Sequence, residues 1–321
     1  MRIFITGASG FIGGRIARHL QDHAEILALA RSPKAAAAVR ALRATPVTAD
    51  LLTLRAEQLE GVSVVIHAAA FVEEFGTRDQ FWQANVEGTR HLLDIARQAG
   101  VQRFIHIGTE AALFVGEDLF DIDESLPLPT THRFLYSETK AEAERLVRSA
   151  SSSDFFTLIL RPRLVWGPGD RTILPALIRL VDSGRWSWLD RGAQRTSTCH
   201  VDNLCSAVER ALTAGRSGEA YFIADDSETT SRAFLGALLS TSGRTAPDRS
   251  LPGSLARPLA HTVEFVWRTL RLSGTPPLVA FSTTMLSRSI TVRTDKAKQE
   301  LGYQPVITRE AGLKALANTS G

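Results

Sequence analysis

Cysteine and long apolar runs are both scarce in this chain. Its 321 residues include two cysteines, Cys199 and Cys205, with His200 between them. Two thiols cannot build a disulfide framework, and this spacing matches no familiar zinc site, so we predict a reducing compartment and no metal. No stretch of about 18 uncharged apolar residues occurs, and no leader pattern precedes the first apolar run. These absences predict a cytoplasmic protein without a transmembrane helix.

Clustered charge is missing as well. The formal net charge is +3, and the 37 Lys and Arg residues are scattered along the chain. Nucleic-acid binding usually needs a basic patch, so no nucleic-acid partner is predicted. Segment 255–272 is apolar but interrupted by charges. We expect an amphipathic helix packed on the protein there, with a peripheral membrane contact as the alternative. The expected partner is a small-molecule substrate, and a homodimer is left open.

The N-terminus carries the clearest pattern. A short apolar run over residues 3–5 predicts a buried parallel strand, and glycines follow with G-x-x-G-x-x-G spacing before a stretch of helical periodicity. Glycine lets the backbone approach a pyrophosphate, and the helix N-terminus directs free N–H groups at that anion. Strand, glycine turn and helix therefore predict a dinucleotide-binding (Rossmann) unit. The cofactor contacts predicted here are Gly7, Ser9, Gly10, Phe11, Ile12 and Gly13.

Apolar runs and helical patterns alternate through the first half. This alternation predicts an α/β fold with a doubly wound parallel sheet covered on both faces. Strands are predicted over 26–30, 62–67, 103–107 and 157–160, and helices over 33–42, 81–99 and 136–150. After residue 161 Pro and Gly become frequent. Later predictions are helices over 173–183, 202–214 and 230–241, and strands over 197–201 and 220–223.

The end of the second predicted strand holds no carboxylate. An acid there would accept the ribose hydroxyls of NAD, but this chain has Arg31. A guanidinium can bind a 2′-phosphate, so NADP(H) is favoured over NAD(H); the alternative is that Arg31 is a solvated turn residue. Asp50, after the next strand, is predicted to bind the adenine amino group, with Leu51 beside the ring.

Tyr136 and Lys140 stand four residues apart at the start of a predicted helix, which puts them on one face. The pKa of a free tyrosine, about 10, is too high for easy proton exchange at neutral pH. A neighbouring ammonium would lower the pKa of Tyr136 and make it a usable general acid or base.

These motifs together resemble the extended short-chain dehydrogenases/reductases, the NAD-dependent epimerase/dehydratase family. The matching pieces, in the family's order, are T-G-A-S-G-F-I-G, H-A-A-A, N-V-E-G-T, R-F-I-H-I-G-T, Y-S-E-T-K, R-P-R-L-V-W-G-P-G-D and K-A-K-Q-E-L-G-Y-Q-P. The resemblance implies that Tyr136 is the acid/base and that Lys140 also binds the nicotinamide ribose. It implies that Thr109 hydrogen-bonds the substrate oxygen, although the family usually has Ser where this chain has Gly108. The remaining cofactor contacts it implies are Ala68, Ala69, Ala70 and Asn85.

Several residues distinguish branches of this family. Sugar 4,6-dehydratases follow the threonine with Asp-Glu, whereas Glu110 is followed by Ala111 here. Nucleotide-sugar epimerases usually carry Arg-x-x-Asp where this chain has Arg288 and Thr291. The chain looks closer to the 3β-hydroxysteroid dehydrogenases, 2-alkyl-3-oxoalkanoate reductases and dihydroflavonol reductases.

That likeness implies an NAD(P)-dependent oxidoreductase that interconverts a secondary alcohol and a ketone. The implied substrate is largely apolar, of the 3-oxo acid or 3β-hydroxysteroid type. A nucleotide-sugar epimerase with a tightly held cofactor and a non-catalytic cofactor-binding regulator stay as alternatives.

The resemblance also implies a smaller, partly interleaved C-terminal substrate lobe. Residues 1–165 would form the dinucleotide-binding domain, with 197–214 returning to it, and 166–196 with 215–321 would form the substrate lobe. The candidates for substrate contact are Val72, Glu110, Arg163, Trp166 and His200.

Overall fold

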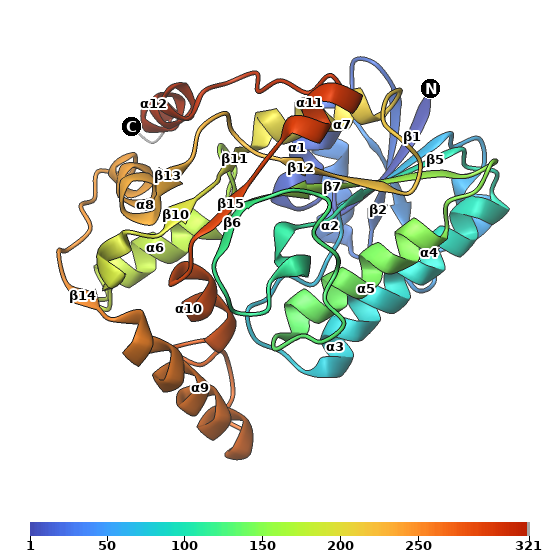
Figure 1. The fold of residues 1–321 in the computed structure, drawn as a ribbon. Helices are drawn as coiled ribbons and strands as arrows, with labels where there is room; N and C mark the ends of the chain where they lie inside the picture. Colours follow the sequence, from blue (N-terminus) through green and yellow to red (C-terminus); the bar gives the residue numbers. More distant parts are fainter. Residues whose placement is uncertain (320–321) are drawn as a thin grey trace.

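A computed structural model describes residues 1–319 and is built around one parallel sheet of seven strands (Figure 1). Every pairing in that sheet is parallel. The spatial order is β12-β7-β5-β4-β1-β2-β3. The strands are β1 (Arg2–Thr6), β2 (Glu25–Ala30), β3 (Thr45–Thr48), β4 (Val64–His67), β5 (Arg103–Ile107), β7 (Phe156–Pro162) and β12 (Glu219–Ile223). The predicted doubly wound α/β fold is confirmed.

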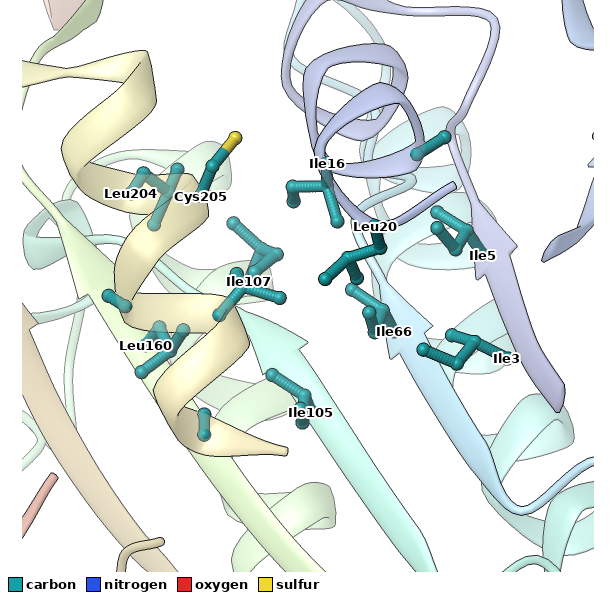
Figure 2. Packing of buried hydrophobic residues seen from close by; sticks show 14 of the residues in the cluster. Ile3, Ile5, Ile16, Leu20, Ile66, Ile105, Ile107, Leu160, Leu204 and Cys205 are labelled. Carbon is teal, nitrogen blue, oxygen red and sulfur yellow. The ribbon is translucent and has the colours of Figure 1, made fainter. Parts of the chain in front are cut away.

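Helices cover both faces of the sheet because its strands are apolar on both sides. In β1, Ile3 and Ile5 join one core while Phe4 joins the other. Figure 2 shows the first core, where Ile16 of α1 and Leu204 of α7 lie over the strands. The helices of this face include α1 (Phe11–Leu20), α2 (Pro33–Ala41) and α7 (Val201–Ala211), and α4 (Gly88–Gln98) and α5 (Leu135–Ser149) cover the other.

The strand order reverses between β1 and β4, which are neighbours in the sheet although about sixty residues separate them. The connection from β1 leads outward to β2, and that from β4 leads to β5 on the other side. A reversal of this kind opens a crevice beyond the carboxyl ends of the strands. The segments that follow β1, β4 and β5 therefore meet at one edge, and they are the segments predicted to form the site.

The second half builds smaller sheets beside this core. A four-stranded sheet has the order β13-β10-β15-β6, and two further strand pairs are β11 with β8 and β14 with β9. The strands are β6 (Leu119–Ile122), β8 (Val165–Trp166), β9 (Trp188–Leu189), β10 (Arg195–Thr196), β11 (Cys199–His200), β13 (Thr229–Thr230), β14 (Ser250–Leu251) and β15 (Ile290–Val292). The remaining helices are α3 (Arg78–Trp82), α6 (Ile173–Asp182), α8 (Ser231–Ser240), α9 (Gly253–Thr269), α10 (Ala280–Leu286), α11 (Asp295–Glu300) and α12 (Arg309–Thr319).

The two sheets exchange strands along the sequence. β12 pairs with β7 at the edge of the main sheet, although residues 215–321 were predicted to belong to the substrate lobe. β6, inside the predicted first domain, pairs with β15 in the smaller sheet. The predicted returning segment, 197–214, includes α7, which packs on the main core, but it ends before β12. The lobes therefore interleave over a longer stretch of sequence than the motifs indicate.

The apolar segment 255–272 falls mostly in α9, which extends away from the body in Figure 1. Ala256 and Ala260 face inward, while Leu255, Phe265 and Leu270 are exposed. The helix is amphipathic, as predicted. Among the helices of residues 1–319, none is both long and apolar enough to cross a membrane.

Candidate functional site

The glycine turn after β1 is shaped by close backbone packing. Gly7 has φ of +76°, a conformation that side chains rarely adopt. A Cβ on Gly7 would lie 2.8 Å from the Ala68 carbonyl carbon, and a Cβ on Gly13 would overlap the Gly7 carbonyl oxygen. The turn therefore brings the backbones after β1 and β4 into contact, and any side chain at these positions would fill the cradle.

The N-terminus of α1 opens onto this cradle. Gly10 caps the helix without a side chain, and no acidic residue occupies the first turn. The free N–H groups and positive end of α1 thus suit a pyrophosphate, so the residues present fit a dinucleotide cofactor. Arg171 Nη1 donates to the Ser9 carbonyl oxygen at 3.4 Å. The sequence did not single out Arg171, because it lies about 160 residues after the glycine turn and just outside the motif that ends at Asp170.

A buried relay holds the Ala68–Ala70 segment in place. Thr89 donates its proton to the Asn85 carbonyl at 2.6 Å, so its oxygen accepts from His67 Nε2 at 3.0 Å. His67 Nδ1 then accepts from Thr6 at 2.7 Å, and Thr6 accepts from the Ala69 N–H at 3.1 Å. Burial, with a smaller effect of Lys140, lowers the pKa of His67 to about 3. His67 is therefore neutral, and one tautomer satisfies every bond.

Arg31 and Asp50 lie at the carboxyl ends of neighbouring strands. Arg31 follows β2 and is exposed, and its side chain has no hydrogen bond or ion pair with any residue of 1–319. Asp50 follows β3 and is also exposed, and its Oδ1 accepts from the Leu52 N–H at 3.1 Å. Leu51 packs against the start of α4 at Gly88. All three lie at the edge of the sheet where the glycine turn lies.

Asn85 ties the loop after β4 to α5. It sits in a π-helical turn, Gln83–Glu87, between α3 and α4. Its Oδ1 accepts from the Phe71 N–H at 2.7 Å, and its Nδ2 donates to the Phe71 carbonyl at 3.2 Å and to Thr139 Oγ1 at 3.1 Å. Such turns often mark functional sites. Val72, which follows Phe71 in this loop, is 56% exposed.

Tyr136, Thr109 and Lys140 come together where β5 ends and α5 begins. Thr109 caps the short 3₁₀ helix Glu110–Leu113, and its hydroxyl shares a hydrogen bond with Tyr136. Lys140, one helical turn after Tyr136, is buried and donates Nζ to the Ile107 carbonyl oxygen at 3.0 Å. The three residues predicted to be catalytic, Tyr136 and Lys140 from one motif and Thr109 from another, therefore occupy one corner of the crevice.

The order of these elements along the chain matches that of a known family. Residues 3–224 match the NAD dependent epimerase/dehydratase family. The chain belongs to this family. The predicted resemblance to the extended short-chain dehydrogenases/reductases is confirmed, since the match spans the whole main sheet and the predicted Tyr, Lys and glycine motifs.

Individual relatives cover nearly the whole chain. A 4-hydroxy-2-methyl-3-oxo-4-farnesyl-3,4-dihydroquinoline-1-oxide ketoreductase of Stigmatella aurantiaca is 40% identical over 320 residues, which is 98% of this chain and 96% of that protein. A 2-alkyl-3-oxoalkanoate reductase of Stenotrophomonas maltophilia is 30% identical over 338 residues, covering 100% and 99%. The crystal structure of gox2253 is similar with a TM-score of 0.79 and 27% identity, covering 99% and 98%.

The pKa of Tyr136 departs from the sequence-based prediction. Burial raises it above the ordinary value, and the Glu110 carboxylate raises it further, whereas the hydrogen bond with Thr109 lowers it. Lys140 is not among the groups that shift it, so the predicted lowering by the ammonium is wrong. The burial of Lys140 instead lowers its own pKa to about 8, against a smaller opposing effect of Glu144.

Gly108 departs from the family pattern for a steric reason. A Cβ at this position would lie 2.8 Å from Ile159 Cγ2 on β7, and the Gly108 N–H donates to the Leu160 carbonyl at 2.8 Å. A serine here would need the Ile159 side chain to shift. Among the described residues at this turn, Thr109 is thus the one hydroxyl placed beside Tyr136.

The predicted substrate residues separate into two groups. Glu110 and Arg163 form a buried ion pair next to Thr109. Trp166 and His200 instead contact each other at 4.7 Å between ring centroids, and both bind Asp225, through the Trp166 indole and the His200 backbone N–H. Within residues 1–319, neither forms a hydrogen bond or ring contact with Thr109 or Tyr136, so the structure gives them a packing role beside β8 and β11.

An aromatic wall faces Tyr136 from the second lobe. The rings of Phe281, on α10, and Tyr136 lie 5.2 Å apart, and Phe281 also meets Phe134 at 5.5 Å. Phe134 in turn stacks on Phe114 and on His261 of α9. The sequence did not indicate Phe281, because a lone aromatic in an irregular C-terminal stretch carries no motif.

Proposed function

We propose that this protein catalyses the NAD(P)-dependent interconversion of a ketone and a secondary alcohol on a largely apolar substrate. The observation that carries the proposal is the corner formed by Tyr136, Thr109 and Lys140, which opens beside a glycine cradle suited to a dinucleotide. A nicotinamide cofactor supplies or accepts the hydride when bound. The protein supplies the acid, the hydrogen bonds and a shaped, water-poor site.

Each residue has a role that follows from its chemistry. Tyr136 gives a proton to the oxygen that becomes the alcohol, and takes it back in the reverse direction. The Thr109 hydroxyl, whose proton is directed at Glu110 before substrate binds, turns to donate it to that oxygen. Lys140, buried behind Tyr136 at the end of β5, offers an ammonium hydrogen to the cofactor ribose while it also binds the Ile107 carbonyl. Asn85 keeps the loop after β4 against α5.

The apolar character of the substrate is supported by two observations. The wall that faces Tyr136 is aromatic and includes Phe281 and Phe134. The Stigmatella relative is named as a ketoreductase of a farnesylated quinoline, and the Stenotrophomonas relative as a reductase of 2-alkyl-3-oxoalkanoates. We therefore propose a substrate of the 3-oxo acid or 3β-hydroxysteroid type, or another ketone of comparable apolar size.

NADP(H) is the proposed cofactor. Arg31 stands exposed at the end of β2, with no side-chain partner among residues 1–319, where a ribose 2′-phosphate would carry its charge. A guanidinium left free at this edge is available for that phosphate.

The test is a substrate screen that follows the absorbance of the reduced cofactor. NADPH and NADH are each mixed with the purified protein and with apolar ketones, 3-oxo acids, ketosteroids and nucleotide sugars. Oxidation of NADPH by an apolar ketone is the expected result. Conversion of a nucleotide sugar without net cofactor consumption, or cofactor binding without turnover of any compound, would reject the proposal in favour of an epimerase or a regulator.

A further inference from the structure

Glu110 and Arg163 form a buried ion pair directly beside the Thr109 hydroxyl. Glu110 Oε2 accepts the Thr109 hydroxyl hydrogen at 2.8 Å, and Glu110 Oε1 accepts from the Arg163 guanidinium. Arg163 also donates to Thr196 Oγ1 of β10 at 3.3 Å. The side chains of the pair are only 3% and 7% exposed, which leaves little of either for contact with a substrate.

This arrangement decides which way the Thr109 hydroxyl points. A hydroxyl has one proton to donate, and Thr109 gives it to Glu110. The hydrogen bond with Thr109 lowers the pKa of Tyr136, because a hydroxyl that donates to the phenolate stabilises it. Glu110 and the Tyr136 phenolate therefore compete for the one proton of Thr109, and Arg163 holds the carboxylate that takes it.

The charges that surround Tyr136 leave Glu110 as its main electrostatic neighbour. Burial raises the pKa of Tyr136 most, and the Glu110 carboxylate raises it further. The three acids of α5 are paired, Glu138 with Arg78, Glu142 with Arg145 and Glu144 with Arg161. Further titratable groups on elements near Tyr136 include Lys140 of α5, His67 of β4, His106 of β5 and His261 of α9.

We propose that Glu110 and Arg163 are positioning residues, in which the Glu110 carboxylate orients the Thr109 hydroxyl and Arg163 holds and neutralises that carboxylate. The pair would thus govern how readily Tyr136 parts with its proton, without touching the substrate. The catalytic meaning of this inference rests on the proposed function. The arrangement of the four side chains does not.

A second buried pair provides a matched control. Arg161, two residues before Arg163, donates Nε to Glu144 Oε2 at 2.9 Å and Nη2 to Glu144 Oε1 at 2.5 Å. Both side chains are 1% exposed. Neither forms a hydrogen bond with Thr109 or Tyr136 among the described residues. Loss of this pair should cost stability without moving the ionisation of Tyr136.

The experiment measures the pH at which the Tyr136 side chain ionises. Phenolate absorbance is followed in the full chain by rapid pH jumps, before alkaline unfolding, and the Tyr136→Phe protein serves as the blank. Glu110→Gln removes the negative charge and should lower the midpoint of the Tyr136 titration by about 1 pH unit. Arg163→Met leaves the Glu110 charge unbalanced and should raise this midpoint by a similar amount. The double variant should return close to wild type, and Glu144→Gln should leave the midpoint in place.

A second readout uses turnover. The pH at which alcohol oxidation accelerates should shift in the same order across these variants, and Arg163→Lys, which keeps the charge, should stay close to wild type. If Arg163→Met fails to fold, Glu110→Gln and the double variant still test the opposite signs. Equal shifts in every variant, no shift in Glu110→Gln, or a shift in Glu144→Gln as large as in Glu110→Gln would overturn the inference. A wild type without ketone reduction would reject the proposed function alone, because the phenolate titration needs no turnover.

Discussion

At the ends of β1 and β4, the candidate cofactor side consists of backbone: the turn at Gly7 touches the Ala68 backbone, and α1 begins there without a side-chain cap. At the ends of β5 and β7, the substrate side consists of side chains from distant segments, including Thr109, Tyr136 and Arg163. The cofactor side forms only if a few nearby positions carry no side chain. The proposed substrate side forms only if particular side chains meet across the fold. Changes on the two sides should therefore affect different quantities.

The largest expected effect is on the substrate side. Tyr136→Phe should lower kcat by about 10²–10⁴-fold, because the proton donor is removed while the ring that packs on Phe281 is kept. Cofactor affinity should stay close to wild type, as judged by fluorescence titration.

Tyr303→Phe is the matched control for that change. Tyr303 donates its hydroxyl to the Ala224 carbonyl in the core, so its loss should cost some stability and no turnover. A Tyr136→Phe enzyme with wild-type kcat would break the division between the two sides.

A smaller effect is expected at Thr109. Thr109→Val keeps the shape but deletes the hydroxyl, and it should lower kcat by tens to hundreds of fold, about 2–3 kcal/mol in the barrier. Thr109→Ser retains the hydroxyl and should recover most of the rate. Steady-state kinetics with equal cofactor occupancy check both, and equal rates for the Val and Ser variants would contradict a role for this hydroxyl.

The cofactor side is tested at Arg31. If its guanidinium binds the 2′-phosphate, Arg31→Ala should weaken NADP(H) binding by about 10- to 100-fold and leave NAD(H) binding nearly unchanged. The preference should also decline with rising salt, because an exposed ion pair is screened. Arg40→Ala, an exposed arginine on α2, is the control. Calorimetric titration measures the binding of both cofactors to each protein. Equal weakening of NADP(H) and NAD(H) binding in Arg31→Ala would contradict the prediction.

The smallest expected effect concerns Lys140, whose role joins the two sides. Burial lowers its pKa from 10.5 to about 8, so the native state binds this proton less firmly than the unfolded chain does. Lys140→Met should therefore raise the free energy of unfolding at pH 7 by about 1–2 kcal/mol, after the lost bond to Ile107 is counted, while activity falls. The gain should shrink as the pH rises from about 8 to 10.5, and above that range only the cost of the lost bond to Ile107 should remain. Denaturant unfolding across this range checks the sign, and a less stable variant at pH 7 would contradict it.

The same difference between the two sides explains which features could be predicted from the sequence. The glycine turn, the order of strands and helices, and the positions of Tyr136 and Lys140 were predictable, because each depends on short-range spacing or on periodicity. The site residues themselves stay predictions until they are tested by mutation. The ion pair of Glu110 with Arg163 was not predictable, since the two residues are 53 positions apart and meet only through the fold.

Other features escaped the sequence for related reasons. Phe281 lies against Tyr136 only because α10 folds back over α5, and no local pattern encodes that contact. The sequence predicts a short strand where β12 lies, but it does not show that this strand pairs with β7 in the main sheet. The pKa of Tyr136 was misjudged because the sequence shows neither the burial nor the nearby Glu110 carboxylate, both of which raise it.

The central claim is that this crevice transfers a hydride between a nicotinamide and a ketone carbon while Tyr136 supplies the proton. Its most direct test uses NADPH carrying deuterium at the transferred position, mixed with an apolar ketone accepted in the screen. The account predicts one deuterium on the carbinol carbon of the product for each NADPH consumed, and almost none with Tyr136→Phe over the same time. Product without deuterium, or labelled product formed at the same rate by Tyr136→Phe, would contradict it.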